Sequence, residues 1–219
     1  IVKIVKKVYN LILYGSFMIK VIIFDLWETL GTKNVGISST LLNHFGFTKN
    51  HDLLVKYENA IQLKKFSTVE DLATSFLSDF ELDQSQENIK FVVDTLQAGV
   101  TKATIFDGIY ELLEELAVNY RLGLVSNTTV FESKLIFDWK IDHFFDVKIF
   151  SWEIGLIKPD PKVFGLICSK LDAQSSDVLF IDDGSKNVVA ARKLGMQAIR
   201  FESVGQLKQE LGVLLKKRL

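Results

Sequence analysis

Four short segments of this chain carry side chains that could bind and attack an anionic group. They contain, in chain order, Asp25 in VIIFDLWETL, Ser126 with Asn127 in GLVSNTT, Lys158 in GLIKPDP, and Asp182 with Asp183 in VLFIDDGSKN. Three segments directly follow an apolar run of strand length, and the lysine segment opens the helix after another such run. Because the strand ends of a parallel sheet share one crevice, we expect a single site there. A carboxylate nucleophile, a hydroxyl, a lysine and a carboxylate pair suit an anionic substrate and a metal ion.

The hydrophobic pattern predicts the elements that would bring these segments together. Strands are expected at 19–24, 122–126, 147–151, 178–182 and 197–201, where short apolar runs occur. Helices are expected between them at 109–119, 130–138, 161–171 and 186–194, with a closing helix at 204–217. Strands that alternate with helices of this length indicate βαβ units, and therefore an α/β fold with a doubly wound parallel sheet.

The stretch from 34 to 104 shows helical signals only. A helix capped by Ser38 and Ser39 should run through Phe45 and end at Gly46, and further helices are expected at 52–66, 69–80 and 86–100. This stretch contains no convincing strand. We therefore expect a small helical insertion between the first strand and the rest of the sheet.

Composition narrows the class of protein. The 219 residues suit one core domain plus a modest insertion, and the net charge of −1 gives no electrostatic reason to expect nucleic acid as a partner. The single cysteine, Cys168, excludes an intrachain disulfide and a cysteine-based metal cluster, which favours the reducing cytoplasm. Cys168 lies in the apolar stretch VFGLICSKL, so we expect a buried structural thiol.

The first residues form a basic amphipathic pattern, IVKIVKKVYNLILY. The uncharged stretch from 8 to 19 would measure about 18 Å as a helix, too short for a bilayer core of about 30 Å, so no membrane partner is expected. Residues 1–17 read as an appended or upstream-translated extension joined at Gly15 and Ser16, ahead of Met18. A native helix packed on the core or on a partner is the alternative.

Together, the segments DLWETL, VSN, IKPDP and FIDDGSKNVVAARKLGM resemble the haloacid dehalogenase-like hydrolase superfamily. The resemblance runs from about residue 19 to residue 201. It implies a Rossmann-like core domain formed by 18–32 and 105–219, and a helical cap domain formed by 33–104.

The resemblance also implies a role for each motif. Asp25 would be the nucleophile, which splits one hydrolysis into two steps through an aspartyl ester or aspartyl phosphate. Ser126 would donate a hydrogen bond to a phosphoryl oxygen, helped by the backbone N–H of Asn127. Lys158 would neutralise the nucleophile and the transferred group, and Thr29 would contact the nucleophile or the phosphate.

The acid pair implies a cofactor. Two adjacent carboxylates at a buried strand end repel each other unless a cation or a proton intervenes. Oxygen ligands beside a phosphorylated substrate favour Mg²⁺. The resemblance makes Asp183 a direct ligand with Asp25 and the backbone carbonyl of Trp27, while Asp182 supports them and Asn187 orders the loop. A helix N-cap pair is the structural alternative.

Trp27 departs from the family pattern. Phosphatases of the family usually carry a second aspartate two residues after the nucleophile, where it acts as general acid and then as base. Indole donates a hydrogen bond but transfers no proton near neutral pH. Glu28 is adjacent, but successive residues of an extended chain point to opposite faces, which makes it a weak substitute.

Three functions therefore remain open. The first is a Mg²⁺-dependent phosphatase that acts on a small phosphorylated molecule, with impaired acid catalysis and a preference for good leaving groups. The second is a metal-independent 2-haloacid dehalogenase, whose halide leaves unassisted. Against it stand the doubled acid and the absence of arginine from residues 33–104. The third is a non-catalytic binding or regulatory protein. The sequence leaves the substrate and the oligomeric state open.

Overall fold

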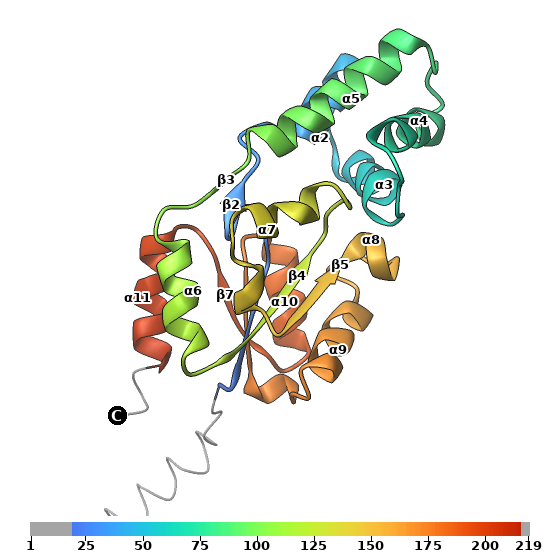
Figure 1. The fold of residues 1–219 in the computed structure, drawn as a ribbon. Helices are drawn as coiled ribbons and strands as arrows, with labels where there is room; N and C mark the ends of the chain where they lie inside the picture. Colours follow the sequence, from blue (N-terminus) through green and yellow to red (C-terminus); the bar gives the residue numbers. More distant parts are fainter. Residues whose placement is uncertain (1–18, 216–219) are drawn as a thin grey trace, which may run out of the picture.

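A central five-stranded parallel sheet carries the fold (Figure 1). The computed structural model describes residues 19–215, so the expectations for 1–17 and for the end of the closing helix lie outside the described residues. The strands stand in the order β5-β4-β1-β6-β7. Their bounds are Val147–Phe150 for β5, Arg121–Ser126 for β4, Val21–Phe24 for β1, Val178–Asp182 for β6 and Gln197–Arg200 for β7. The doubly wound α/β fold predicted from the sequence is confirmed.

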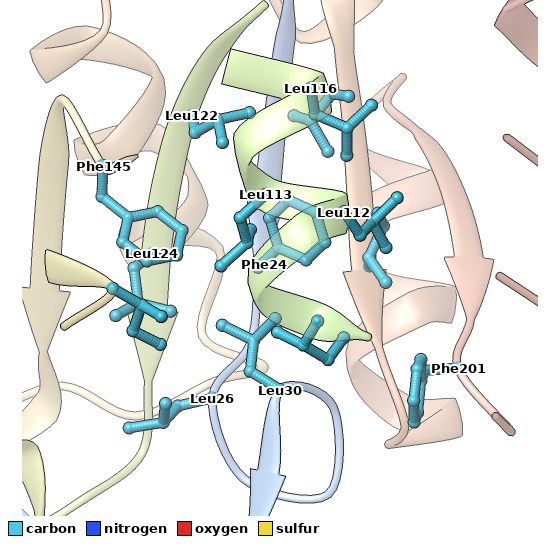
Figure 2. Packing of buried hydrophobic residues seen from close by; sticks show 14 of the residues in the cluster. Phe24, Leu26, Leu30, Leu112, Leu113, Leu116, Leu122, Leu124, Phe145 and Phe201 are labelled. Atoms are coloured by element: carbon cyan, nitrogen blue, oxygen red, sulfur yellow. The ribbon is translucent and has the colours of Figure 1, made fainter. Parts of the chain in front are cut away.

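The two faces of the sheet are covered by different helices, as the alternation of side chains along a strand requires. Ile22 and Phe24 of β1 belong to the cluster with α6 (Ile109–Ala117) and α11 (Val204–Leu215). Val21 and Ile23 belong to the opposite cluster, with α9 (Pro161–Lys170) and α10 (Ser185–Lys193). Figure 2 shows part of the first cluster, in which Leu112 and Leu113 of α6 lie next to the Phe24 ring.

A helical unit with its own hydrophobic cluster lies beyond the carboxyl ends of the strands (Figure 1). It consists of α2 (Ile37–His44), α3 (His51–Gln62), α4 (Val69–Asp79) and α5 (Gln86–Thr101). A capping box between Thr68 and Asp71 begins α4. The unit follows the first strand, as the sequence predicted.

Two short antiparallel strands, β2 (Gly31–Thr32) and β3 (Thr104–Ile105), connect this helical unit with the sheet. Gly31 is required there, because a Cβ atom would lie 2.6 Å from the Thr104 carbonyl oxygen and 2.7 Å from the Trp139 ring. The sequence predicted neither strand, since two-residue strands have no readable alternation.

Several element boundaries differ from the predictions. Helix α2 has Gly36 as its N-cap, so Ser38 and Ser39 lie inside the helix rather than capping it. Helix α3 is shorter than predicted. The helix predicted at 130–138 is a 3-10 turn, η1 (Glu132–Lys134), followed by α7 (Leu135–Asp138). A four-residue helix, α8 (Ser151–Ile154), follows β5, and Lys158 lies in the turn before α9 rather than opening it.

Asp160 accepts a hydrogen bond from the Lys162 N–H and forms the N-cap of α9. Cys168 of this helix is buried, as predicted. Within residues 19–215, every helix is too short or too polar to cross a bilayer.

Candidate active site

The carboxyl ends of β1 and β6 place three charged groups in direct contact. Asp25 follows β1 and Asp182 ends β6, on the two sides of the point where the strand order reverses. Lys158 Nζ donates to Asp25 Oδ1 at 2.5 Å and to Asp182 Oδ2 at 2.7 Å. All three side chains are buried. The structure thus brings together three of the residues that the sequence singled out.

Asp182 is held on every side by donors. The Gly184 N–H donates to its Oδ1 at 2.8 Å, and Asn187 Nδ2 lies 2.9 Å and 3.0 Å from the two carboxylate oxygens. Together with Lys158, these contacts occupy the carboxylate of Asp182. Its geometry therefore fits the supporting role predicted for it, and that of Asn187 fits the ordering of this loop.

Thr29 links Asp25 to the loop after β6. Its hydroxyl donates to Asp25 Oδ2 at 3.5 Å and accepts from the backbone N–H of Asp183 at 3.2 Å. The ligand atoms of Asp25, Asp182 and Asp183 lie within 4.8 Å of one another. Asp183 is only half-buried, so its carboxylate stays open to a ligand.

Burial and mutual repulsion hold protons on this cluster. Burial raises the pKa of Asp25 to about 7, with Lys158 lowering it and Asp182 adding to the rise. Burial and then the charge of Asp182 raise the pKa of Asp183 to about 6. Burial alone would lower the pKa of Lys158. The negative charges of Asp182 and Asp25 have the larger combined effect and raise this pKa above its ordinary value. A carboxylate cluster with one lysine lacks positive charge, which a bound cation would supply.

Ser126 ends β4, on the other side of β1, and Asn127 follows it. Ser126 is 1% exposed, and none of the described residues forms a hydrogen bond with its hydroxyl. A buried hydroxyl without a partner is costly and marks a place for a ligand. The Asn127 side chain accepts from the Lys158 N–H at 2.8 Å and donates to the Lys158 carbonyl at 3.0 Å. This contact, which the sequence did not predict, fixes the backbone of Lys158.

Trp27 is buried and held by a network that the sequence did not predict. Its indole N–H donates to Thr128 Oγ1 at 3.0 Å, and that hydroxyl donates to Glu132 Oε2 at 3.1 Å. Lys33 Nζ forms an ion pair with Glu132 Oε1 at 2.6 Å, although the angles are not those of a hydrogen bond. The same Nζ lies 4.7 Å from the centre of the Trp27 ring. The Trp139 ring packs edge-on against Trp27 at 5.8 Å.

One local signal could have identified Glu132. The sequence TVFE has the spacing of a capping box, and the structure forms the two reciprocal hydrogen bonds of that motif, although Phe131 is the N-cap of the 3-10 turn η1 that follows. The Glu132 N–H donates to Thr129 Oγ1 and the Thr129 N–H donates to Glu132 Oε2. Nothing local indicates the contact of Glu132 with Thr128 and Lys33.

Glu28 adopts a conformation that contradicts the argument made from the sequence. Its φ is +58°, the left-handed region, so the rule for extended chains does not apply. Its carboxylate accepts a hydrogen bond from the Thr32 hydroxyl at 2.8 Å. The pKa of Asp183 is raised mainly by burial and next by the charge of Asp182, and the charge of Glu28 adds a smaller increase. Glu28 therefore lies on the same side as the acidic cluster.

The helical unit reaches the sheet near this site. Lys186, at the start of α10, places its Nζ 3.0 Å from Nδ1 of His51, the first residue of α3. Together with the β2–β3 connection, this contact ties the unit to the edge that holds the carboxylates.

A doubly wound sheet with an acidic cluster at its strand-order reversal places this chain among the α/β proteins, in which this edge is the usual place for a ligand. The chain belongs to the haloacid dehalogenase-like hydrolases, because the model of that family matches residues 22–201. This confirms the resemblance read from the motifs.

Two relatives are phosphatases. The chain is 26% identical over 196 residues to a glyceraldehyde 3-phosphate phosphatase of Pyrococcus abyssi, covering 84% of this chain and 82% of the relative. It is 28% identical over 111 residues to a D-ribitol-5-phosphate phosphatase of Bacteroides thetaiotaomicron, covering 46% of this chain and 52% of the relative. The chain spans between 13% and 52% of the first curated relatives it matches.

A solved structure with the same fold is a haloacid dehalogenase family enzyme of Bacteroides thetaiotaomicron, described as a complex with magnesium and inorganic phosphate. It is 20% identical, with a TM-score of 0.63, and covers 86% of this chain and 98% of the other. At this identity the likeness shows the fold.

Proposed function

We propose that this protein is a Mg²⁺-dependent phosphatase that hydrolyses phosphate monoesters through Asp25. The observation that carries the proposal is the buried Asp25 carboxylate, held by Lys158 beside two further carboxylates. The Ser126 hydroxyl at the end of β4, which has no partner among the described residues, adds a donor for a phosphoryl oxygen. Two relatives named as phosphatases support the same class of reaction.

In the first step, a carboxylate oxygen of Asp25 forms a bond with phosphorus while the ester P–O bond breaks. The electron pair stays on the departing oxygen, which takes a proton from water. In the second step, water forms a bond with phosphorus and the bond to Asp25 breaks, which releases inorganic phosphate. The charge of Lys158 stabilises the attacking carboxylate and the phosphoryl oxygens in both steps.

The donor set fits Mg²⁺, because it consists of clustered carboxylates whose raised pKa values reflect missing positive charge. Asp25, Asp183 and the carbonyl of Trp27 would hold the ion, while Asp182 holds Lys158. When bound, Mg²⁺ neutralises charge on the phosphoryl group.

Trp27 sets the expected substrate preference. Its N–H is committed to Thr128, so the residue offers no proton to the leaving group. The rate should therefore depend steeply on leaving-group acidity, with aryl and acyl phosphates ahead of alkyl phosphates. The aspartyl phosphate should also persist, because no side chain at this position activates water.

The experiment is a panel of phosphate esters assayed with Mg²⁺ and with chelator. We expect metal-dependent phosphate release from aryl phosphates, lost in Asp25→Asn and retained in the exposed control Asp83→Asn. Mass spectrometry should detect a phosphate adduct on Asp25. Binding without any turnover would instead indicate a non-catalytic member of the fold.

The dehalogenase alternative predicts halide release from L-2-chloropropionate without metal. We expect none, because the acidic cluster repels a carboxylate substrate. Chloride release that Asp25→Asn abolishes would overturn the proposed function in favour of this alternative.

A further inference from the structure

A cavity of about 370 Å³ lies between the helical unit and the core. Its walls come from α4, from the end of α5, and from the loop after β4 together with the 3-10 turn η1. The apolar walls are formed by Val69, Leu72, Leu96, Val100 and Phe131. Its size is that of a small-molecule site, for which mostly apolar walls with a few polar groups are typical.

The polar groups of this cavity offer little to a hydroxyl-rich ligand. Glu132 is buried in the wall, and its carboxylate is already engaged by Lys33, Thr128 and the Thr129 N–H. Thr129 is also buried in the wall, and its hydroxyl accepts from the Glu132 N–H. Gln97, Thr101 and Lys134 lie at exposed positions. A polyol placed among these walls would leave hydroxyls unpaired, whereas an apolar group would gain by leaving water.

The cavity is joined to the proposed phosphate site by one loop. Ser126 ends β4 directly before this loop, and its hydroxyl has no partner among residues 19–215. Glu132 in the cavity wall follows six positions later in the sequence. Between them, Thr128 connects Glu132 to Trp27, which is two residues after Asp25. The cavity wall is thus two hydrogen bonds away from Trp27.

We infer that this cavity binds the organic group of the substrate, and that the substrate is a phosphate monoester of an apolar alcohol or phenol. The inference rests on the proposed function, which supplies the phosphate end. The phenol esters agree with the lack of an acid at Trp27, because a phenolate leaves without a proton donor, whereas esters of alcohols should react more slowly. It differs from the polyol and sugar phosphates in the names of the two relatives.

Varying the alkyl chain length of the substrate tests binding in the cavity independently of leaving-group chemistry. Ethyl and hexyl phosphate release primary alcohols of similar acidity, so leaving-group effects cancel between them. We expect kcat/KM to be on the order of 10- to 100-fold higher for hexyl phosphate, since each buried methylene contributes. Hexylphosphonate should bind more tightly than ethylphosphonate by a similar factor in calorimetry with Mg²⁺.

Two variants test whether the preference for the longer alkyl chain arises in the cavity. Val100→Phe fills the apolar space and should remove most of the preference for the longer chain, whereas the same change at the exposed Val118 should not. If Val100→Phe fails to fold, Val69→Asp replaces it. Val69 is half-buried in the first turn of α4, where an acidic residue is favourable, and a charge there should repel the hexyl chain.

The outcomes separate the two proposals. Turnover without a chain-length preference would overturn the cavity inference and leave the proposed function standing. Hexylphosphonate binding that Val100→Phe weakens, without turnover of any ester, would overturn the function and support the cavity. A preference that survives in folded Val100→Phe and Val69→Asp would show that the apolar group binds elsewhere.

Discussion

Replacing Trp27 by aspartate tests whether the missing general acid at this position limits the departure of the leaving group. The change removes a buried ring that packs on Trp139 and donates to Thr128. Truncation of a buried Trp typically costs about 3–5 kcal/mol. In a chain of this size, that corresponds to a fall in Tm of roughly 6–20 °C. The variant should therefore be assayed at low temperature.

The gain in activity follows from the surroundings of Trp27. A general acid–base group typically contributes about 10²- to 10⁴-fold in rate. Lys33 Nζ lies 4.7 Å from the centre of the Trp27 ring, so an aspartate there would lie near a positive charge that favours its ionised form. We therefore expect kcat/KM for alkyl phosphates to rise by about 10²-fold, the low end of this range. Breakdown of the aspartyl phosphate should gain more, because that step needs a base.

The assay compares kcat/KM for esters of graded leaving-group acidity in the parent, in Trp27→Asp and in Trp27→Phe. The phenylalanine variant keeps an apolar ring but adds no acid, so it controls for the loss of packing. The slope against leaving-group pKa should flatten only in Trp27→Asp. Equal turnover of alkyl and aryl phosphates by the parent would refute the reasoning and make Glu28 the next residue to test.

Three further predictions concern the acidic cluster and its neighbours. Mg²⁺ should bind about a hundredfold more tightly near pH 7.5 than near pH 5.5 in calorimetry, because Asp25 and Asp183, with pKa values of about 7 and about 6, must lose protons first. Equal affinity at both pH values would contradict this. Ser126→Ala should lower kcat/KM roughly 10- to 150-fold while Tm hardly changes, since its hydroxyl has no partner among the described residues. Glu28→Gly should raise the free energy of unfolding by about 1 kcal/mol in urea, by relieving the left-handed φ of +58°. A lower urea midpoint would show that the Glu28 contacts outweigh the strain.

Much of the fold could be predicted because its signals are local. Each buried strand is a short apolar run, and the helices between the strands have regular apolar spacing, so the parallel sheet followed from pattern alone. Short elements could not be predicted this way. Strands β2 and β3 are two residues each, and they form through pairing between segments that lie far apart in the sequence.

The sequence by itself determined where the charged residues meet. Asp25, Lys158 and Asp182 each occur near the carboxyl end of a strand or in the connection after it, and a parallel sheet brings these ends to one edge. Their contact therefore follows from topology. The roles proposed for them remain predictions.

Only the tertiary structure decided what surrounds Trp27. Its partner Thr128 is 101 positions away, and the Lys33–Glu132 ion pair joins the connection to the helical unit with the loop after β4. The cavity beside them exists because α4, α5 and that loop pack together without filling the space between them. Such contacts depend on side-chain shape and on long-range packing, which have no periodic signal in a single sequence.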